Sequence, residues 1–125
     1  MEFLRMTAKE YRQQFTKNKY HAQKIDVGGI TFDSKKEAKI WEKLQEMARI
    51  GVITGLERQK RFELVPKQAD ERSVVYVADY VYFEVEAQRW VVADCKSAMT
   101  KKLPVYVIKR KLMKWRYPEY KFVEL

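Results

Sequence analysis

The chain has 125 residues, of which 46% are hydrophobic and 14% are aromatic. This length and composition predict one globular domain and exclude a disordered chain. No apolar run approaches the roughly 20 residues that span a bilayer, and the N-terminus lacks the apolar segment of a signal peptide, so we expect a cytoplasmic protein without membrane partners. The single cysteine excludes an internal disulfide and a cysteine-based zinc site.

The net charge of +9 is unevenly distributed. Residues 1–36 carry eight basic and four acidic side chains, and residues 97–125 carry eight and two, whereas the residues between them carry ten and eleven. Basic ends around an acid-bearing middle favour a polyanion that is bound at the rim and processed at the centre. A basic surface without a ligand is the alternative, and charge alone does not separate DNA from RNA or from an anionic membrane.

The N-terminal part of the chain predicts a basic arm before the main domain. Residues 7–16 fit a short helix, because Thr7 and Glu10 have capping-box spacing, and residues 17–21 form a basic arm. We therefore divide the chain into an arm with a short helix over residues 1–20 and one domain over residues 21–125.

A small hairpin and the clearest helix follow. Residues 24–32 alternate apolar and polar side chains around two glycines, which predicts the hairpin. Ser34 is an N-cap residue with Glu37 three positions later, and Gly51 marks the end of the helix. We expect its inward stripe to consist of Trp41, Leu44 and Ala48.

Three extended segments occupy the middle of the chain, at residues 53–66, 74–83 and 90–96. The second and third are apolar at consecutive positions, which is typical of strands in a sheet that is covered on both faces. After a polar loop at 97–102, Pro104 opens a helix that runs to about Arg116, and residues 121–125 fit a last strand. We expect the buried stripe of this helix to be Val105, Ile108, Leu112 and Trp115.

A pair of charged residues ends the third segment. Side chains two apart in a strand point to the same face, so Asp94 and Lys96 lie together, and Asp79 lies in the preceding strand. An acid in an apolar strand is costly unless it has a partner. A divalent cation held by Asp79 and Asp94, with Lys96 near a phosphate or an attacking water, accounts for this arrangement and predicts a metal-dependent nuclease.

The order helix, three strands, helix, strand, with Asp-x14-Asp-x-Lys across the second and third strands, resembles the PD-(D/E)xK nuclease superfamily. More narrowly, the chain is similar to DUF1064, a family of small phage and prophage proteins, over residues 18–125. The segments that carry this similarity are NKYHAQKIDVGGITFDSKKEA, VYVADYVY, VVADCKS and VIKRKLMKWRYP.

The resemblance implies an α/β fold with a restriction-endonuclease-like core (α-β-β-β-α-β), in which helices flank a mixed central sheet. It implies that Asp79, Asp94 and the helix acid Glu37 hold Mg²⁺ or Mn²⁺ through hard oxygen ligands, and that Lys96 is the motif lysine. Lys96 would stabilise developing negative charge or orient the water. The family usually has glycine after this lysine; Ser97 fits there if its backbone φ is negative.

The implied function is a Mg²⁺-dependent endodeoxyribonuclease in the host cytoplasm that acts in phage DNA recombination or processing. The substrate would be branched DNA such as a Holliday junction, and the protein would be a homodimer, because several small superfamily members resolve junctions as homodimers. A catalytically inactive DNA-binding or assembly protein with the same fold is the alternative.

We expect DNA contacts from the arm and from basic residues near both helices: Lys17, Lys19, Tyr20, Lys35, Lys36, Lys101, Lys102, Arg110 and Lys114. Other interpretations stay open at this point. Glu37 could serve only as the capping partner of Ser34, and Asp79 could form a salt bridge to an arginine. Asp94 and Lys96 could be a simple strand-end pair, and the lysines of the second helix could be a solvated face.

Overall fold

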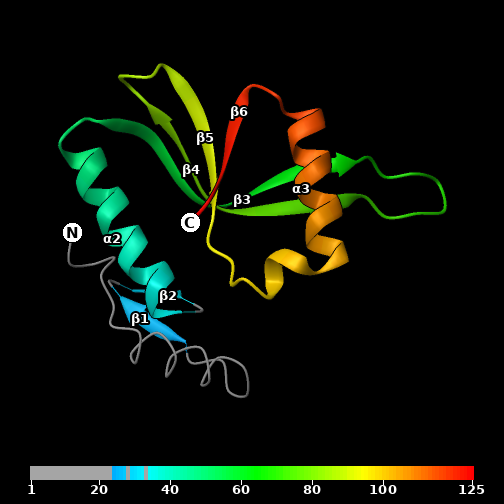
Figure 1. The fold of residues 1–125 in the computed structure, drawn as a ribbon, viewed down its shortest axis with the longest axis horizontal. Coiled ribbons are helices and arrows are strands. Elements are labelled where there is room, and N and C mark those ends of the chain that lie inside the picture. The colour runs from blue at the N-terminus through cyan, green and yellow to red at the C-terminus, as the bar shows by residue number, and fades with distance from the viewer. Residues whose placement is uncertain (1–23, 28, 33) are drawn as a thin grey trace. The chain divides into compact units, whose positions relative to one another are not determined.

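The computed structural model describes residues 24–27, 29–32 and 34–125 (Figure 1). The predicted short helix at 7–16, the basic arm at 17–21 and the boundary after residue 20 lie outside these residues. The protein is α/β, with a mixed four-stranded sheet and two described α-helices. The chain divides into two compact units, Met1–Arg49 and Ile50–Leu125.

In the first unit, β1 (Ile25–Val27) and β2 (Ile30–Phe32) form the predicted antiparallel hairpin, and α2 (Lys35–Arg49) follows it. The Ser34 hydroxyl accepts a hydrogen bond of 3.1 Å from the backbone N–H of Glu37, which confirms Ser34 as the N-cap.

The predicted inward stripe of α2 is wrong in part. Leu44 is buried, but Trp41 and Ala48 are only half-buried, and the other buried residues are Ala38 and Ile40. Ala38 and Ile40 are about 200° apart around the helix at 3.6 residues per turn, so α2 is buried on more than one side. A single-stripe pattern does not describe such a helix.

The second unit contains the sheet, with strand order β3-β4-β5-β6. The first three strands are antiparallel, whereas β6 runs parallel to β5. A parallel pair needs a crossover connection, and the segment between β5 and β6 contains a 3-10 helix, η2, and the helix α3. The bounds are β3 Ile53–Val65, β4 Val74–Glu84, β5 Arg89–Asp94, η2 Thr100–Lys102, α3 Pro104–Arg116 and β6 Tyr120–Glu124. The predicted order of elements is therefore confirmed.

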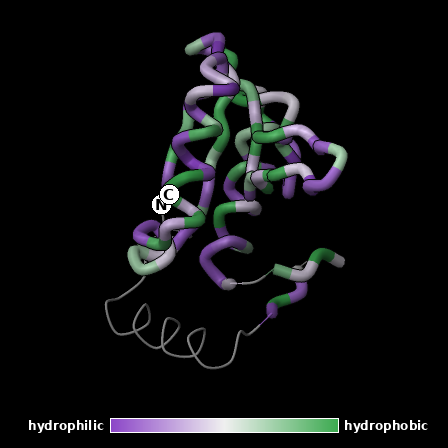
Figure 2. The backbone as a smooth tube through the Cα atoms, turned by 90° about the vertical axis from the view of Figure 1, so that its right-hand side faces the viewer, coloured by the Kyte–Doolittle hydropathy of each residue, from purple (hydrophilic) through white to green (hydrophobic). Residues whose placement is uncertain are grey.

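The core of this unit lies between α3 and the sheet. Met113 of α3 packs with side chains of β3, β4 and β5, and Figure 1 shows α3 lying across β3. The strand residues of this cluster are Phe62, Leu64, Tyr76, Ala78, Val81 and Val92. Figure 2 shows that hydrophobic and hydrophilic residues are interleaved along the chain, as expected when each element buries one side and exposes the other.

The predicted buried stripe of α3 is wrong. Val105, Ile108 and Trp115 are exposed, Leu112 is only partly buried, and the buried residues are Tyr106 and Met113. Tyr106 and Met113 are seven positions apart and so lie on one face of the helix. The helix has apolar residues on two faces, and the sequence pattern alone selected the outward one.

The end of β5 also differs from the prediction. The strand stops at Asp94 rather than residue 96, and the loop at 97–102 contains η2. Ser97 is not among the residues with positive φ, and its hydroxyl accepts a hydrogen bond of 3.1 Å from the N–H of Thr100. Serine in place of the family glycine is therefore accommodated without backbone strain. Neither described helix has the length and apolar character that a bilayer crossing requires.

Candidate metal centre

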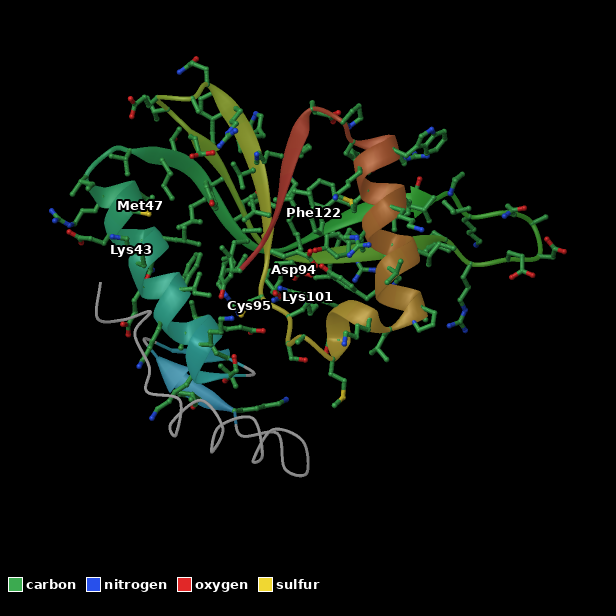
Figure 3. All side chains as sticks on the ribbon, viewed as in Figure 1. Lys43, Met47, Asp94, Cys95, Lys101 and Phe122 are labelled. Carbon is green, nitrogen blue, oxygen red and sulfur yellow. The ribbon has the colours of Figure 1, made fainter. Side chains whose placement is uncertain are left out.

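The pairing of β4 with β5 brings two aspartates together. Tyr80 pairs with Ala93 in the antiparallel register, so the preceding Asp79 lies beside the following Asp94. Both side chains are buried: Asp79 is 6% exposed and Asp94 is fully buried. Figure 3 shows Asp94 at the end of β5, with Cys95 next to it. Two neighbouring carboxyl groups inside a protein repel each other and lose hydration, so they need compensating partners.

Lys96 contacts both carboxyl groups. Its Nζ lies 3.0 Å from Oδ1 of Asp94 and 3.4 Å from Oδ2 of Asp79. Burial lowers the pKa of the Lys96 ammonium, but the negative charges of Asp79 and Asp94 outweigh this effect, so its pKa is raised. Lys96 therefore stays charged and bridges the two acids.

Asp79 has further partners. Its Oδ2 accepts a hydrogen bond of 2.8 Å from the backbone N–H of Cys95, and its Oδ1 accepts one of 3.4 Å from the Gln59 amide. Gln59 lies in β3 with φ of 52°, a left-handed conformation that is unfavourable for a residue with a side chain. Asp79 is thus held from two strands and from the backbone that follows Asp94.

Asp94 is less well compensated. Its Oδ2 is buried and makes no well-formed hydrogen bond among the described residues, although the Tyr76 hydroxyl interacts with this carboxyl group. Burial, and then the hydrogen bond and negative charge of Asp79, raise the pKa of Asp94 to about 7, although Lys96 acts in the opposite direction. Near neutral pH the Asp94 carboxyl is therefore poised between its protonated and charged forms.

The residues fit a small hard cation. Carboxylate oxygens are the ligands that Mg²⁺ and Mn²⁺ prefer, and the buried Oδ2 of Asp94, which makes no well-formed hydrogen bond among the described residues, is such an oxygen. The part of the chain described here has no group of three or more His, Cys, Asp or Glu side chains that could hold a metal ion. Two carboxylates suffice for Mg²⁺ when water and substrate oxygens complete its coordination.

Two tyrosines lie next to this centre, and the sequence analysis did not assign them to it. Burial, and then the negative charge of Asp94 and a side-chain hydrogen bond with it, raise the pKa of the buried Tyr76 hydroxyl. The Tyr106 hydroxyl donates a hydrogen bond of 2.5 Å to Glu124. Glu124 pairs with Asp94 in the parallel register of β5 and β6, so the two acids are neighbours across the strands. No sequence signal marks these residues, because their position depends on strand register.

The other predicted residues are spread over the structure. Glu37, Lys35 and Lys36 lie in the first turn of α2, in the N-terminal unit. Lys101 and Lys102 lie in η2, a few residues after Lys96 along the chain. Arg110 and Lys114 lie on α3, where Arg110 is 4.0 Å from the carboxylate of Glu124. The predicted DNA-binding residues Lys17, Lys19 and Tyr20 are outside the described residues.

Of the predicted site residues, the structure therefore brings together Asp79, Asp94 and Lys96. The arginine partner that was the alternative for Asp79 is replaced by Lys96, Gln59 and the Cys95 backbone. Comparison with known proteins gives one family: the family described as "Protein of unknown function (DUF1064)" matches residues 17–124. No curated protein and no solved structure matches the chain.

Proposed function

The chain belongs to the DUF1064 family, and we propose that it is a metal-dependent endodeoxyribonuclease. The observation that carries the proposal is the centre formed by Asp79, Asp94 and Lys96, in which one lysine contacts two buried aspartates and the buried Oδ2 of Asp94 makes no well-formed hydrogen bond among the described residues.

Each side chain has a role in phosphodiester hydrolysis. Asp79 and Asp94 would hold Mg²⁺ or Mn²⁺ through their carboxylate oxygens. A divalent cation, when bound, polarises the scissile phosphodiester and acidifies water. Lys96 stabilises the negative charge that develops on the phosphate or orients the attacking water. The Cys95 N–H and Gln59 fix the orientation of Asp79, which keeps the centre rigid before substrate arrives.

The fold belongs to the same proposal. The order α-β-β-β-α-β and the mixed sheet support a restriction-endonuclease-like core of the PD-(D/E)xK superfamily. The net charge of +9 supports a polyanionic substrate. We propose branched DNA, as in a Holliday junction resolvase of a phage acting in DNA recombination, with a homodimer presenting two centres to opposing strands.

The first experiment measures cleavage and metal binding together. Labelled four-way junction, duplex, single-stranded DNA and RNA are incubated with wild type, Asp94→Asn and Lys96→Ala in Mg²⁺, Mn²⁺ or EDTA. We expect metal-dependent DNA cleavage that each variant abolishes while DNA binding persists. Thermal stabilisation by Mn²⁺ without DNA should occur in the wild type and disappear in Asp94→Asn, because the metal binds only the folded site.

Matched controls are available in the loop between β3 and β4. Asp70 and Lys67 are exposed residues of the same types, so Asp70→Asn and Lys67→Ala should leave cleavage and metal stabilisation unchanged. Equal cleavage by wild type and Asp94→Asn would rule out this centre. DNA binding without cleavage by any variant or metal would favour the alternative function, a catalytically inactive DNA-binding or assembly protein.

A further inference from the structure

The helix α3 exposes an apolar stripe that the core does not use. Val105 is 65% exposed, Ile108 58% and Trp115 75%, although Tyr106 and Met113 of the same helix are buried. We call Val105, Ile108 and Trp115 the outer stripe. Successive positions are 100° apart around a helix, so these three residues lie within about 80° of one another. Apolar side chains that gather on one exposed face mark an interaction site when the patch is large and is rimmed by polar residues.

The positive charges around the outer stripe favour an anionic partner. α3 carries five cations and no acidic residue, and η2 before it adds Lys101 and Lys102. The five cations are Lys109, Arg110, Lys111, Lys114 and Arg116. Two copies of this helix facing each other would bring ten cations together, which disfavours a second copy of the chain. A nucleic acid strand offers both the negative charge and the flat apolar surfaces that the stripe needs.

We propose that the outer stripe binds an unpaired strand of the DNA substrate, with the Trp115 indole stacking on a base. In paired DNA the faces of the bases are covered by their neighbours, so stacking on a side chain requires an unpaired or unstacked base. Lys111 and Lys114 are exposed and lie within one turn of Trp115, where they can contact the phosphates of that strand. This inference rests on the proposed nuclease function and narrows its branched substrate from a fully paired four-way junction to branched DNA with an unpaired strand.

The outer stripe lies on the helix whose first turn contacts the neighbour of the metal centre. Tyr106, in the first turn of α3, binds Glu124, which is the register partner of Asp94. Trp115 lies nine positions further along the helix, which is about 14 Å. The preferred substrate therefore has an unpaired strand close to the scissile phosphate, as in a forked or flapped branch.

The test measures DNA binding in EDTA, so that cleavage does not contribute. Fluorescence anisotropy compares oligothymidine, a fork with a single-stranded arm, a fully paired duplex and a fully paired four-way junction. Trp115→Ala should weaken binding to the single strand and the fork about tenfold or more and leave duplex binding unchanged. Trp115→Phe should retain most of the affinity, whereas Trp115→Leu should behave like Trp115→Ala, because leucine is apolar but does not stack.

Several outcomes would overturn the inference. Equal loss on all four DNAs would show that Trp115 supports a general electrostatic surface, and full affinity of Trp115→Leu would show that apolar contact alone is sufficient. Sedimentation that reveals a dimer, which Ile108→Glu dissociates without changing single-strand binding, would assign the stripe to self-association. Circular dichroism of each variant verifies folding. If Asp94→Asn still cleaves but Trp115→Ala loses single-strand binding, the proposed centre is wrong and the stacking surface stands.

Discussion

At the scale of single residues, the structure places two acids side by side with one lysine. Asp94 is the acid whose charge is less well compensated. In the metal-free protein the pKa of Asp94 is about 7, against an ordinary value of 3.8, because of burial and the neighbouring Asp79. The folded state therefore binds this proton more tightly than the unfolded state. This contribution to stability is present at acidic pH and is lost as the pH rises from about 4 to 7.

We predict that Asp94→Asn stabilises the metal-free protein. In EDTA at pH 8, its free energy of unfolding should exceed that of the wild type by about 2–4 kcal/mol, since each pKa unit corresponds to about 1.4 kcal/mol. The difference should shrink towards zero as the pH falls below the ordinary pKa of 3.8, because Asp94 is then protonated in both states. Urea denaturation at several pH values measures it, with Asp70→Asn as the control. A difference that stays constant across this range would show that Asp94 does not titrate as described.

A second prediction concerns the strained backbone of Gln59. Gln59 and Gln88 both have φ of 52°, but only Gln59 donates a hydrogen bond to Asp79, whereas Gln88 lies in the turn between β4 and β5. Glycine adopts this conformation without steric cost, so Gln59→Gly and Gln88→Gly should each be neutral or stabilising by up to about 1 kcal/mol.

The two glycine variants should differ in activity. Gln59→Gly should lower the cleavage rate several-fold, because Asp79 loses one of its orienting partners, while Gln88→Gly should cleave at the wild-type rate. Thermal unfolding and initial cleavage rates measure the two effects separately. If both variants cleave normally, the Gln59 amide has no role in orienting Asp79.

Part of this centre could be predicted from the sequence, because two physical rules depend only on residues that are close together along the chain. Alternation along a strand places Asp94 and Lys96 on one face, and an acid inside an apolar strand, such as Asp79, needs a partner. The remaining partners come from register and backbone geometry. The Cys95 N–H, the Tyr76 hydroxyl and Glu124 reach the centre only because of how particular strands pair. The composition and the spacing of residues do not predict how these strands pair.

At the scale of secondary-structure elements, the order and type of elements follow from the sequence, but the buried faces do not. The bounds of α3 follow from Pro104 and from the chain leaving the helix before Pro118. The buried face of α3 does not follow from the sequence, because Val105, Ile108 and Trp115 are as apolar as Tyr106 and Met113. Two contacts fix the face of α3 that packs on the sheet: the hydrogen bond from the Tyr106 hydroxyl to Glu124, and the packing of Met113 in the core.

We predict a large difference between two truncations on α3. Met113 is 2% exposed and packs with Phe62 and Val92, so Met113→Ala should cost about 2–4 kcal/mol of unfolding free energy. Ile108 is exposed, so Ile108→Ala should change it by less than about 0.5 kcal/mol. Urea denaturation compares the two. Equal destabilisation would mean that the outer stripe is covered in solution. The buried face of α3 would then be the one that the sequence pattern predicted.

At the scale of the whole molecule, the mixed sheet and the distribution of charge act together. The parallel pairing of β5 with β6 requires the crossover through η2 and α3, and this crossover carries seven of the 26 basic residues. The connection that closes the sheet beside Asp94 is thus strongly cationic. The sequence predicted the excess of basic residues after residue 96, but only the sheet order shows that the segment carrying them crosses from β5 to its parallel neighbour β6.

We therefore predict that salt weakens DNA binding through this connection in particular. On duplex DNA, each phosphate contact contributes about −0.9 to the slope of log affinity against log salt concentration. The double variant Lys101→Ala/Lys102→Ala should reduce the magnitude of the slope by up to about 1.8, whereas Lys67→Ala, in the loop between β3 and β4, should leave it unchanged. Anisotropy titrations in EDTA across a range of salt concentrations measure the slopes. Equal slopes for all three proteins would place the phosphate contacts elsewhere on the chain, and a flat salt response of the wild type would contradict a polyanionic substrate altogether.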